Sequence, residues 1–477
     1  MIGVATVGNK GDVSAFTRTA EGGKVTVENG ATLILGNIKD PGKYTITEGY
    51  LTNDVVGGWN DAAHLYALSA EDTGLSWKLV LQHDANTIWI DATPEEATSV
   101  YKDLIVPNIV DDSLLNCNSG NAGANFICKV LKDPKLDVAG KTRVINSVAQ
   151  IAFAGGAMAT SANDMSTAID SLEGHLSFKD EVFTPEGYLR DIGFGSNLWI
   201  DMIGGKQSYK SLSATGYAKE GFKTDSYGFI AGYDQKLSNK PILLGGAFSV
   251  LRGDLKSRAG ELLPTTSQYD SYGIHAYGLW TPSPALNLVG NLSYMHNSAD
   301  IDQTLEGSDF SKAEVNVGTR LFAASLRAET HLKYGDFIVI PHIGARYIHA
   351  KMSDFATKVD GQTIWNTSSE GVNAFQTPVG VALRSDFQTA SGWVVCPHAD
   401  LTFIPTFGDR DYASTVKNGN AVTDGLSAEY LSKYATSLKV GVQGDYGPST
   451  VGLSYRVIRS NHGGLDQALK LELRHAF

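Results

Sequence analysis

Cysteine and proline are scarce in the sequence, and no apolar run in it is long. The 477 residues include three cysteines and 14 prolines. No CxxC pair or Cys/His cluster occurs, so we expect neither a metal site nor a cofactor. The best apolar run, at 151–159, falls well short of the roughly 20 residues that a membrane-spanning helix needs. Insertion into a membrane would therefore require a closed β-barrel, the other fold that satisfies every backbone amide in lipid.

Positive charge is in deficit as well. The chain has 39 Lys and Arg against 51 Asp and Glu, a formal net charge of −12. This balance argues against nucleic acid as a partner, because phosphate binding needs a basic face. The composition is instead rich in glycine, with 51 residues, and in tyrosine, with 20. Together with few prolines, these counts favour many strands and turns, so we expect an all-β fold.

The segment before the C-terminus alternates apolar and charged side chains. Leu469, Leu471 and Leu473 are separated by single charged residues, and the chain ends at Phe477. A period of two places the leucines on one face of a strand and the charges on the other. A sheet with one face in water would show this pattern. A transmembrane barrel would also show it, with the leucines toward lipid and the charges toward a wet lumen.

Segments of this kind recur from residue 197 to the end. Each is about ten residues long, which is the length that a tilted strand needs to cross a bilayer. We count twelve, an even number that favours a closed antiparallel transmembrane barrel. Their expected spans are 197–207, 225–236, 241–255, 269–281, 286–299, 314–333, 336–351, 375–388, 393–406, 431–446, 449–459 and 466–477. Within them we expect these charged residues to line the lumen: Asp201, Lys206, Arg327, Glu329, Lys333, Arg346, Asp400, Lys439, Arg456, Lys470, Glu472 and Arg474.

The expected connections between these strands alternate between short and long. Two are short turns, at 334–335 and 447–448, and two are long loops, at 353–374 and 408–429, rich in Asn, Thr, Asp and Gly. Short turns at one rim and long loops at the other are typical of outer-membrane barrels. Aromatic residues near the expected strand ends predict a girdle at the membrane interfaces. These are Trp199, Trp280, Tyr294 and Tyr446.

A helical segment with many small residues precedes the strands. Val144, Val148 and Ile151 share one apolar face, and Ile169 and Leu172 recur at helical spacing. The abundant alanines make such a helix slender enough to pass through a barrel lumen. Without a barrel, the same pattern would describe an ordinary amphipathic helix packed on a domain. We therefore assign residues 141–180 to a linker helix in the lumen and 181–477 to the barrel.

Short strands broken by glycine and asparagine characterise residues 1–110. Residues 24–27 and 31–35 flank an Asn29-Gly30 turn, and 75–92 contains two more strands around a polar turn. Such strands predict the rungs of a β-solenoid. They are too few to define a period, and a small sandwich is the alternative. Residues 1–10 lack the regions of a secretory signal peptide, although a truncated start would look the same.

Residues 111–140 form a polar linker that carries two of the three cysteines. Cys117 and Cys128 lie eleven positions apart. They can close a short disulfide loop if the chain is exported, and otherwise they are two reduced thiols. The sequence leaves both alternatives open.

The order of solenoid-like strands, linker, small-residue helix, twelve strands and terminal phenylalanine resembles the C-terminal part of a monomeric (type Va) autotransporter. The residues that carry the resemblance are RVINS at 143–147, NLWID at 197–201 and LELRHAF at 471–477. It covers about residues 141–477. The resemblance implies a translocator barrel in the bacterial outer membrane that exports or displays its own N-terminal passenger. Residues 1–110 would be the C-terminal stub of that passenger, at the cell surface or secreted, and an adhesin is one candidate for its activity.

The resemblance also implies a monomer with three partners: outer-membrane lipid, the barrel-assembly machinery and its own passenger. The assembly machinery would read alternate residues of the last strand. These are Leu469, Leu471, Leu473 and Phe477. His475 departs from the apolar or aromatic residue that is usual in the family.

The sequence contains no protease motif. Some autotransporters cut their passenger inside the barrel, with an asparagine beside a carboxylate. Here the candidate is Asn163, followed by Asp164, with Glu329 or Glu472 as the carboxylate. The family's tandem asparagine is absent, and we favour a structural helix-capping role for Asn163. Two other functions stay open: a diffusive porin or channel, and a soluble β-rich adhesin.

Overall fold

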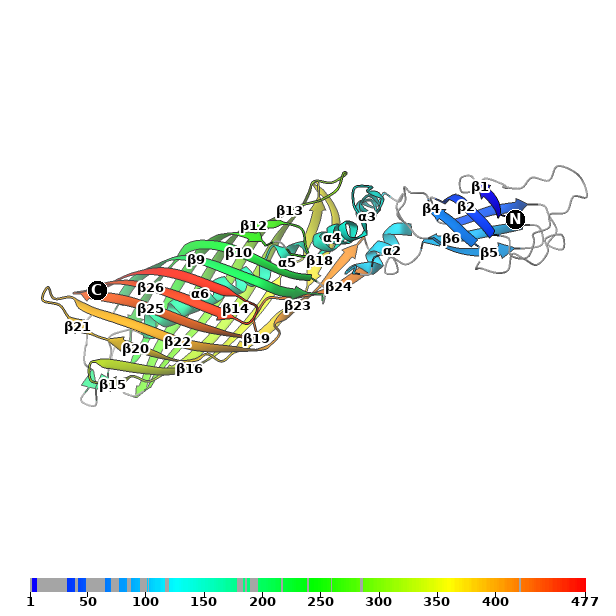
Figure 1. Cartoon of the computed structure of the whole chain (residues 1–477). Helices are drawn as coiled ribbons and strands as arrows, with labels where there is room; N and C mark the ends of the chain where they lie inside the picture. Colours follow the sequence, from blue (N-terminus) through cyan, green and yellow to red (C-terminus); the bar gives the residue numbers. More distant parts are fainter. Residues whose placement is uncertain are drawn as a thin grey trace, which may run out of the picture. The chain divides into compact units, whose positions relative to one another are not determined.

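The structure is a computed structural model of the chain (Figure 1). It describes residues 2–6, 32–38, 42–48, 65–69, 77–83, 87–94, 101, 103–115, 120–177, 183–184, 187–188, 196–215, 218–237, 240–258, 260–283, 286–419 and 422–477. The chain divides into two compact units. One comprises residues 1–145 with 306–311 and 418–424, and the other comprises 146–305, 312–417 and 425–477.

A closed antiparallel barrel makes up most of the larger unit. Twelve strands pair in chain order around it, and the last pairs with the first. They are β9 (Ser196–Ala214), β10 (Ala218–Lys236), β11 (Ile242–Ser257), β12 (Thr265–Ser283), β13 (Leu286–Thr304), β14 (Lys312–Glu329), β16 (Phe337–Met352), β20 (Val379–Ser385), β22 (Val394–Gly408), β25 (Tyr434–Tyr446), β26 (Ser449–Ser460) and β27 (Leu465–Ala476). Each of the twelve predicted segments overlaps one of these strands. The predicted twelve-stranded barrel is therefore confirmed.

Side chains of the barrel strands alternate between an outer and an inner face. On β13, Leu292 is 55% exposed while Ser293 and Met295 are buried. On β27, Leu469 and Leu473 face outward, at 51% and 38% exposure. Large apolar side chains that cover an outer surface are stable when that surface meets an apolar phase. The alternation thus follows the pattern expected of strands whose outer face contacts lipid.

Both turns that the sequence predicts as short are tight glycine turns. Gly335 has φ +59° and Gly447 has φ +55°. Neither would meet another atom within 4 Å if a Cβ were added. Glycine is therefore required at these two positions by the backbone conformation and not by lack of space, because positive φ favours glycine.

The two predicted long loops contain strands of their own. β17 (Phe355–Val359) and β18 (Gln362–Ser369) form one hairpin, and β23 (Asp411–Asn418) and β24 (Val422–Glu429) form the other. The sequence analysis predicted two long connections but not the strands within them. The local signal was Asp360-Gly361, which has φ values of +47° and +80° and forms the kind of turn that favours this dipeptide. The remaining short strands of the unit are β7 (Phe183–Thr184), β8 (Gly187–Tyr188), β15 (Leu332–Tyr334), β19 (Val372–Gln376) and β21 (Phe387–Gln388).

The predicted helix before the barrel is present in three pieces: α4 (Val138–Ala149), α5 (Ile151–Ala154) and α6 (Ala157–Ser177). Two glycines separate α5 from α6. Gly156 has φ +62°, and a Cβ on Gly155 would lie 2.5 Å from Ile301 Cγ2. Side chains at these positions would be strained or would clash, so the glycines permit the break. Among the described helices, none has the length and apolar character needed to cross a membrane.

The smaller unit is helical where the sequence predicts a polar linker. It contains α2 (Pro107–Leu115) and α3 (Ala122–Lys132). The inner face of α3 buries Phe126, Ile127 and Val130, which is an amphipathic helical pattern. The polar residues at both ends of α3 conceal this short apolar stripe in the sequence.

The N-terminal strands form two small sheets. β1 (Ile2–Thr6), β2 (Thr32–Ile38) and β4 (Leu65–Ser69) pair in parallel. β3 (Gly42–Glu48), β6 (Thr87–Pro94) and β5 (Trp77–His83) pair antiparallel. Parallel pairing suits a solenoid and antiparallel pairing does not, so the solenoid stays a prediction. The predicted Asn29-Gly30 turn lies outside the described residues.

Candidate functional site

Helix α6 contacts strands on every side, so it lies in the barrel lumen (Figure 1). Ser171 donates to Asp201 of β9, and Ser325 of β14 donates to Glu173 at 2.9 Å. Of its 21 residues, 17 are buried. A helix with polar residues on several faces and almost no exposure must be enclosed by other protein. The luminal helix that the sequence predicts is confirmed, and we call its surroundings the luminal site.

Asp170 connects the middle of α6 to two arginines of the wall. Arg346 Nη2 of β16 lies 2.9 Å from Asp170 Oδ1, and Arg456 Nη1 of β26 lies 2.6 Å from Asp170 Oδ2. Arg346 also approaches Glu173 at 3.6 Å, and Arg456 pairs with Asp466 at 2.7 Å. Removing one member of a buried ion pair leaves an uncompensated charge, which is strongly destabilising. These pairs therefore hold the helix to one side of the wall.

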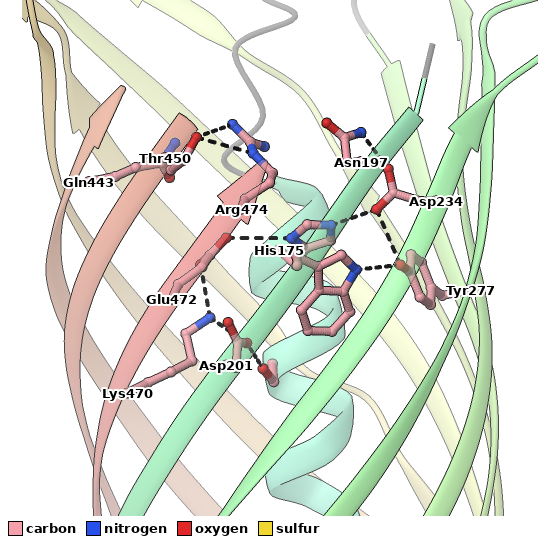
Figure 2. A network of polar contacts seen from close by, with 12 residues as sticks. His175, Asn197, Asp201, Asp234, Tyr277, Gln443, Thr450, Lys470, Glu472 and Arg474 are labelled. Carbon is pink, nitrogen blue, oxygen red and sulfur yellow. Dashed lines mark hydrogen bonds and ion pairs between the residues drawn. The ribbon is translucent and has the colours of Figure 1, made fainter. Parts of the chain in front are cut away.

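His175, in the last turn of α6, lies between two carboxylates of the wall (Figure 2). Its Nε2 is 2.7 Å from Asp234 Oδ2 of β10, and its Nδ1 is 3.4 Å from Glu472 Oε1 of β27. The imidazole stacks on Trp199 with 4.4 Å between ring centroids. Trp199 donates to Tyr277 Oη at 2.6 Å. This network joins the end of the helix to the first and last barrel strands.

Lys470 connects the same two strands beneath His175 (Figure 2). Its Nζ lies 2.9 Å from Asp201 Oδ2 of β9 and 3.1 Å from Glu472 Oε2 on its own strand. Asp201 is fully buried. A buried carboxylate needs a charged or hydrogen-bonding partner, and Lys470 supplies one across the seam where the barrel closes. The ion pair thus reinforces the β9–β27 closure.

A third network lies on the strands opposite this seam. Arg327 pairs with Glu329 at 3.1 Å and with Asp400 at 3.6 Å. Asp400 also contacts His342 at 3.2 Å, and Glu329 contacts His331 at 3.2 Å. Charges of the wall are therefore paired with each other as well as with the helix.

Most charged residues that the sequence assigns to the lumen lie there. The structure places these inside: Asp201, Arg327, Glu329, Arg346, Asp400, Lys439, Arg456, Lys470, Glu472 and Arg474. The predicted luminal position was wrong for Lys206 and Lys333. Lys206 shares the outward parity of Leu198 and pairs with Asp225 on the outer surface. Lys333 lies on the exposed strand β15, because β14 ends at Glu329 and its alternation stops there.

One aromatic residue of the predicted girdle is inside the barrel. Trp280, Tyr294 and Tyr446 are 49%, 43% and 54% exposed, on the outer face. Trp199 is only 2% exposed. Gly232, directly across from it on β10, leaves room for the indole, since a Cβ there would lie 2.6 Å from the ring. The shared parity of Trp199 with the buried Asp201 was the signal that sequence reasoning missed.

The helix contributes charged groups that the sequence analysis did not single out. These are Asp170, Glu173 and His175, with Asp234 and Asp466 as wall residues of the same networks. Charged side chains on an alanine-rich helix are the signal that could have identified the first three. Their partners lie on distant strands, so no spacing along the chain connects them.

The structure does not bring together the residues of the candidate self-cleavage site. Asp164 accepts a hydrogen bond from Ser271 at 2.6 Å. Glu472 contacts His175, which is twelve residues from Asn163 in the sequence and about 18 Å further along the helix. Glu329 instead pairs with Arg327 and His331. Neither carboxylate is placed to act on the Asn163–Asp164 peptide bond.

Cysteine and metal chemistry can be described for part of the chain. Cys128 is disulfide-bonded, and Cys396 is a buried thiol outside any disulfide. Cys117 lies outside the described residues, so its pairing with Cys128 stays a prediction. Within the described ranges, no group of three or more His, Cys, Asp or Glu side chains is arranged to hold a metal ion.

The chain is similar to known proteins in its barrel. Residues 198–456, more than half of the chain, match the family model of the autotransporter β-domain. The translocator domain of the autotransporter NalP from Neisseria meningitidis is 13% identical, with a TM-score of 0.49 over 69% of this chain and 100% of that one. The transport unit of AIDA-I from Escherichia coli is 14% identical, with a TM-score of 0.42 over 67% of this chain and 99% of that one.

A third similar structure is the β-domain of the Bordetella autotransporter BrkA. It is 14% identical, with a TM-score of 0.42 over 59% of this chain and 100% of that one. No curated protein sequence matches the chain. The family match begins in β9 and ends in β26, so it covers the barrel strands except β27 and the end of β26, and the barrel is an outer-membrane translocator for a passenger domain. The chain therefore belongs to the autotransporter β-domain family.

Proposed function

We propose that the barrel exports the residues that precede it, holds them at the cell surface, and is then closed by α6 as a plug. The observation that carries this proposal is the enclosure of α6 by the wall, with Asp170 and His175 each contacting two wall residues. A diffusive porin has no use for a helix bound in this way. The passenger's ligand or activity is not part of the proposal.

Outer-membrane lipid is the proposed partner of the outer face. Exposed aromatic residues near strand ends support this assignment, for example Tyr434 and Tyr446, the first and last residues of β25, and Trp280 near the end of β12. Amphipathic aromatic rings are favoured at membrane interfaces. Between them the outer face is mostly aliphatic, with Leu438 and Val440 exposed on β25.

The barrel-assembly machinery is the proposed partner of β27. Leu469, Leu473 and Phe477 are 51%, 38% and 56% exposed, while Leu471 is half-buried on the same face. An assembly factor could therefore contact these side chains before lipid covers them. His475 also faces outward and lies 3.0 Å from Ser449 Oγ, so the departure from the family pattern is accommodated by a hydrogen bond.

Two carboxylates support display of the passenger at the cell surface rather than its release. Asp424 of β24 accepts the backbone N–H of Ile109 at 2.8 Å, at the start of α2. Asp133, after α3, accepts bonds from Ser308 N at 2.5 Å and Ser308 Oγ at 3.1 Å, in the β13–β14 connection. Burial acts to raise the pKa of Asp133, but the bonds from Lys135 and Ser308 outweigh it and hold that pKa below its usual value. Helices α2 and α3, together called the exit module, are thus bound to Asp424 of β24 and to the β13–β14 connection within their own compact unit.

The experiment is surface proteolysis of cells that express the full chain in a Gram-negative outer membrane. A protease added outside should remove epitopes placed near residue 60, while the barrel stays intact and shifts its gel mobility on heating. The culture medium should contain no passenger fragment. An epitope that becomes accessible only after lysis would overturn export, and a fragment in the medium would overturn display.

Conductance in planar bilayers tests the plug separately. The full chain should conduct little, and replacing 157–177 with a flexible Gly/Ser segment of equal length should raise the conductance many-fold. High conductance of the full chain that is unchanged by this replacement would favour a porin instead.

A further inference from the structure

Helix α6 sits off the centre of the lumen. Its backbone packs mainly on β12, β13 and β14, where small buried residues such as Ala299 and Ala323 allow close approach. On its opposite side, facing β16, β22, β25 and β26, two cavities remain between helix and wall. The lumen is therefore sealed tightly on one side of α6 and loosely on the other.

The two cavities have volumes of about 60 Å³ and 80 Å³. A single water needs on the order of 10–15 Å³ by this measure, so each cavity has room for several. The first lies beside Glu173 and Gly174, near the end of α6, and the second lies beside Ala159 and Asn163, nearer its start. Together they follow most of the length of the helix.

Asp170 and Arg346 line both cavities and mark the boundary between them. At this boundary Asp170 bridges Arg346 and Arg456, with ion-pair distances of 2.9 Å and 2.6 Å. The bridge is the side-chain arrangement that separates one cavity from the other. We call it the Arg–Asp–Arg bridge.

Buried polar atoms without a hydrogen-bond partner gather around these cavities. Those that border the first cavity are all donors: Arg327 Nη2, Arg346 Nε and Arg456 Nε. Those that border the second are Arg346 Nε, which is shared with the first, and Gln207 Oε1, Gln376 Oε1, Ser432 Oγ and Ser460 Oγ. Buried polar atoms are costly unless water or an ion satisfies them. The clustering indicates that both cavities are hydrated.

The side chains that line the first cavity include one more cation than carboxylate, and two of these cations, Arg327 and Arg456, also pair with carboxylates outside the lining. Its charged lining consists of the cations Arg327, Arg346, Lys439 and Arg456 against the carboxylates Asp170, Glu173 and Asp400, with His342 beside them. Guanidinium N–H groups that point at water favour anions over cations. Lys439 Nζ reaches under the helix at Gly174, where a Cβ would lie 2.4 Å from it.

We propose that the loosely packed side of α6 carries a hydrated path for small inorganic anions, closed by the Arg–Asp–Arg bridge. With Asp170 in place, its carboxylate bridges the two guanidinium groups, which also pair with Glu173 and Asp466, and blocks the passage. Loss of that one negative charge opens the bridge and makes the cluster more positive by one charge, which favours the passage of chloride. This activity goes beyond export of the passenger, and it rests on α6 remaining in the lumen as proposed above.

The test compares Asp170→Asn with Asp164→Asn, each in the full chain reconstituted in a planar bilayer under a KCl gradient. Asp164 is also a buried aspartate of α6, but it bonds Ser271 of β12 and lines neither cavity. D170N should raise the conductance several-fold over the unaltered chain and shift the reversal potential toward that of chloride. D164N should change neither.

Three results would overturn the proposal. D170N could conduct no more than the unaltered chain, D164N could have the same effect, or the new current could be cation-selective. Polymer exclusion distinguishes a path opened beside α6 from loss of the whole helix from the lumen. The Gly/Ser replacement of 157–177 should admit polyethylene glycols, whereas a path beside α6 should exclude them. A D170N pore that admits them also overturns the proposal. High conductance of the unaltered chain would instead overturn the plug, so the two failures are distinguishable.

Discussion

At the scale of single residues, the parity of a position along its strand decides whether a side chain meets lipid or the lumen. Trp199 and Leu198 are neighbours, yet the first is 2% exposed and the second 56%. The indole is held by His175 and Tyr277, and it fits because Gly232 faces it. A bulky luminal residue therefore depends on a small one on the next strand.

This dependence predicts different outcomes for two glycines of adjacent strands. Gly232→Ala should destabilise the barrel by about 1–3 kcal/mol, because the new Cβ forces the indole from its position. Gly204→Ala is the control, since a Cβ there meets nothing within 4 Å. The measurement is the temperature at which the folded band converts to the unfolded band on gels. Equal conversion temperatures for the two variants would contradict the proposed fit.

A second prediction at the scale of single residues concerns Asp424. It caps α2 through the backbone N–H groups of Asn108 and Ile109, at 3.3 Å and 2.8 Å. Asp424→Ala should cost roughly 0.5–2 kcal/mol, the usual effect of losing a helix cap. Amide exchange in α2 should accelerate accordingly.

Asp309→Ala, at an exposed position of the β13–β14 connection, is the control for this cap. It should leave exchange in α2 unchanged. If both variants or neither accelerate exchange, the cap does not stabilise the exit module.

At the scale of elements, the last strand has two separate roles. Its inward residues Lys470 and Glu472 complete the seam with β9, while its outward residues are the proposed assembly signal. Phe477→Ala should therefore lower the amount of barrel assembled in the membrane without changing the stability of barrels that do assemble. Lys470→Ala should lower the stability of the assembled barrel, because Asp201 loses its buried partner.

Quantitative blotting of the heat-modifiable band measures assembly, and its conversion temperature measures stability. The two-role interpretation fails if both variants change the same quantity. His475→Ala serves as the control, since the His475 side chain is exposed and its hydrogen-bond partner is Ser449.

Elements also differ in how well the sequence predicts them. The membrane-spanning strands could be predicted because lipid on one side and water on the other impose a period of two. The β17–β18 and β23–β24 hairpins were missed because their polar strands pair outside any such constraint. Helices α2 and α3 were missed for a related reason: the apolar stripe of α3 is short and flanked by polar residues.

At the scale of the whole molecule, the lumen is what the sequence predicts least well. The inward wall charges follow from parity, and most were placed correctly. Their partners on α6 were not, since Asp170 and Arg456 are separated by 286 positions and no local pattern links them. The bridge, the His175 network and the off-centre packing of α6 are products of barrel closure, which brings distant strands onto one helix.

The central claim is that α6 stays in the lumen after the passenger has been exported. Asp164 and Ser271 are in direct contact, so cysteines at both positions should form a disulfide that links helix to wall. The variant would also carry Cys396→Ala, to remove a buried thiol that could exchange with the new cysteines. On intact cells already stripped of surface epitopes by protease, we expect the linked form in nearly every assembled barrel. A pairing of Asp164→Cys with Ser298→Cys, which lies outside the contact, should stay unlinked. Absence of the Asp164–Ser271 link in exported, assembled protein would contradict the account.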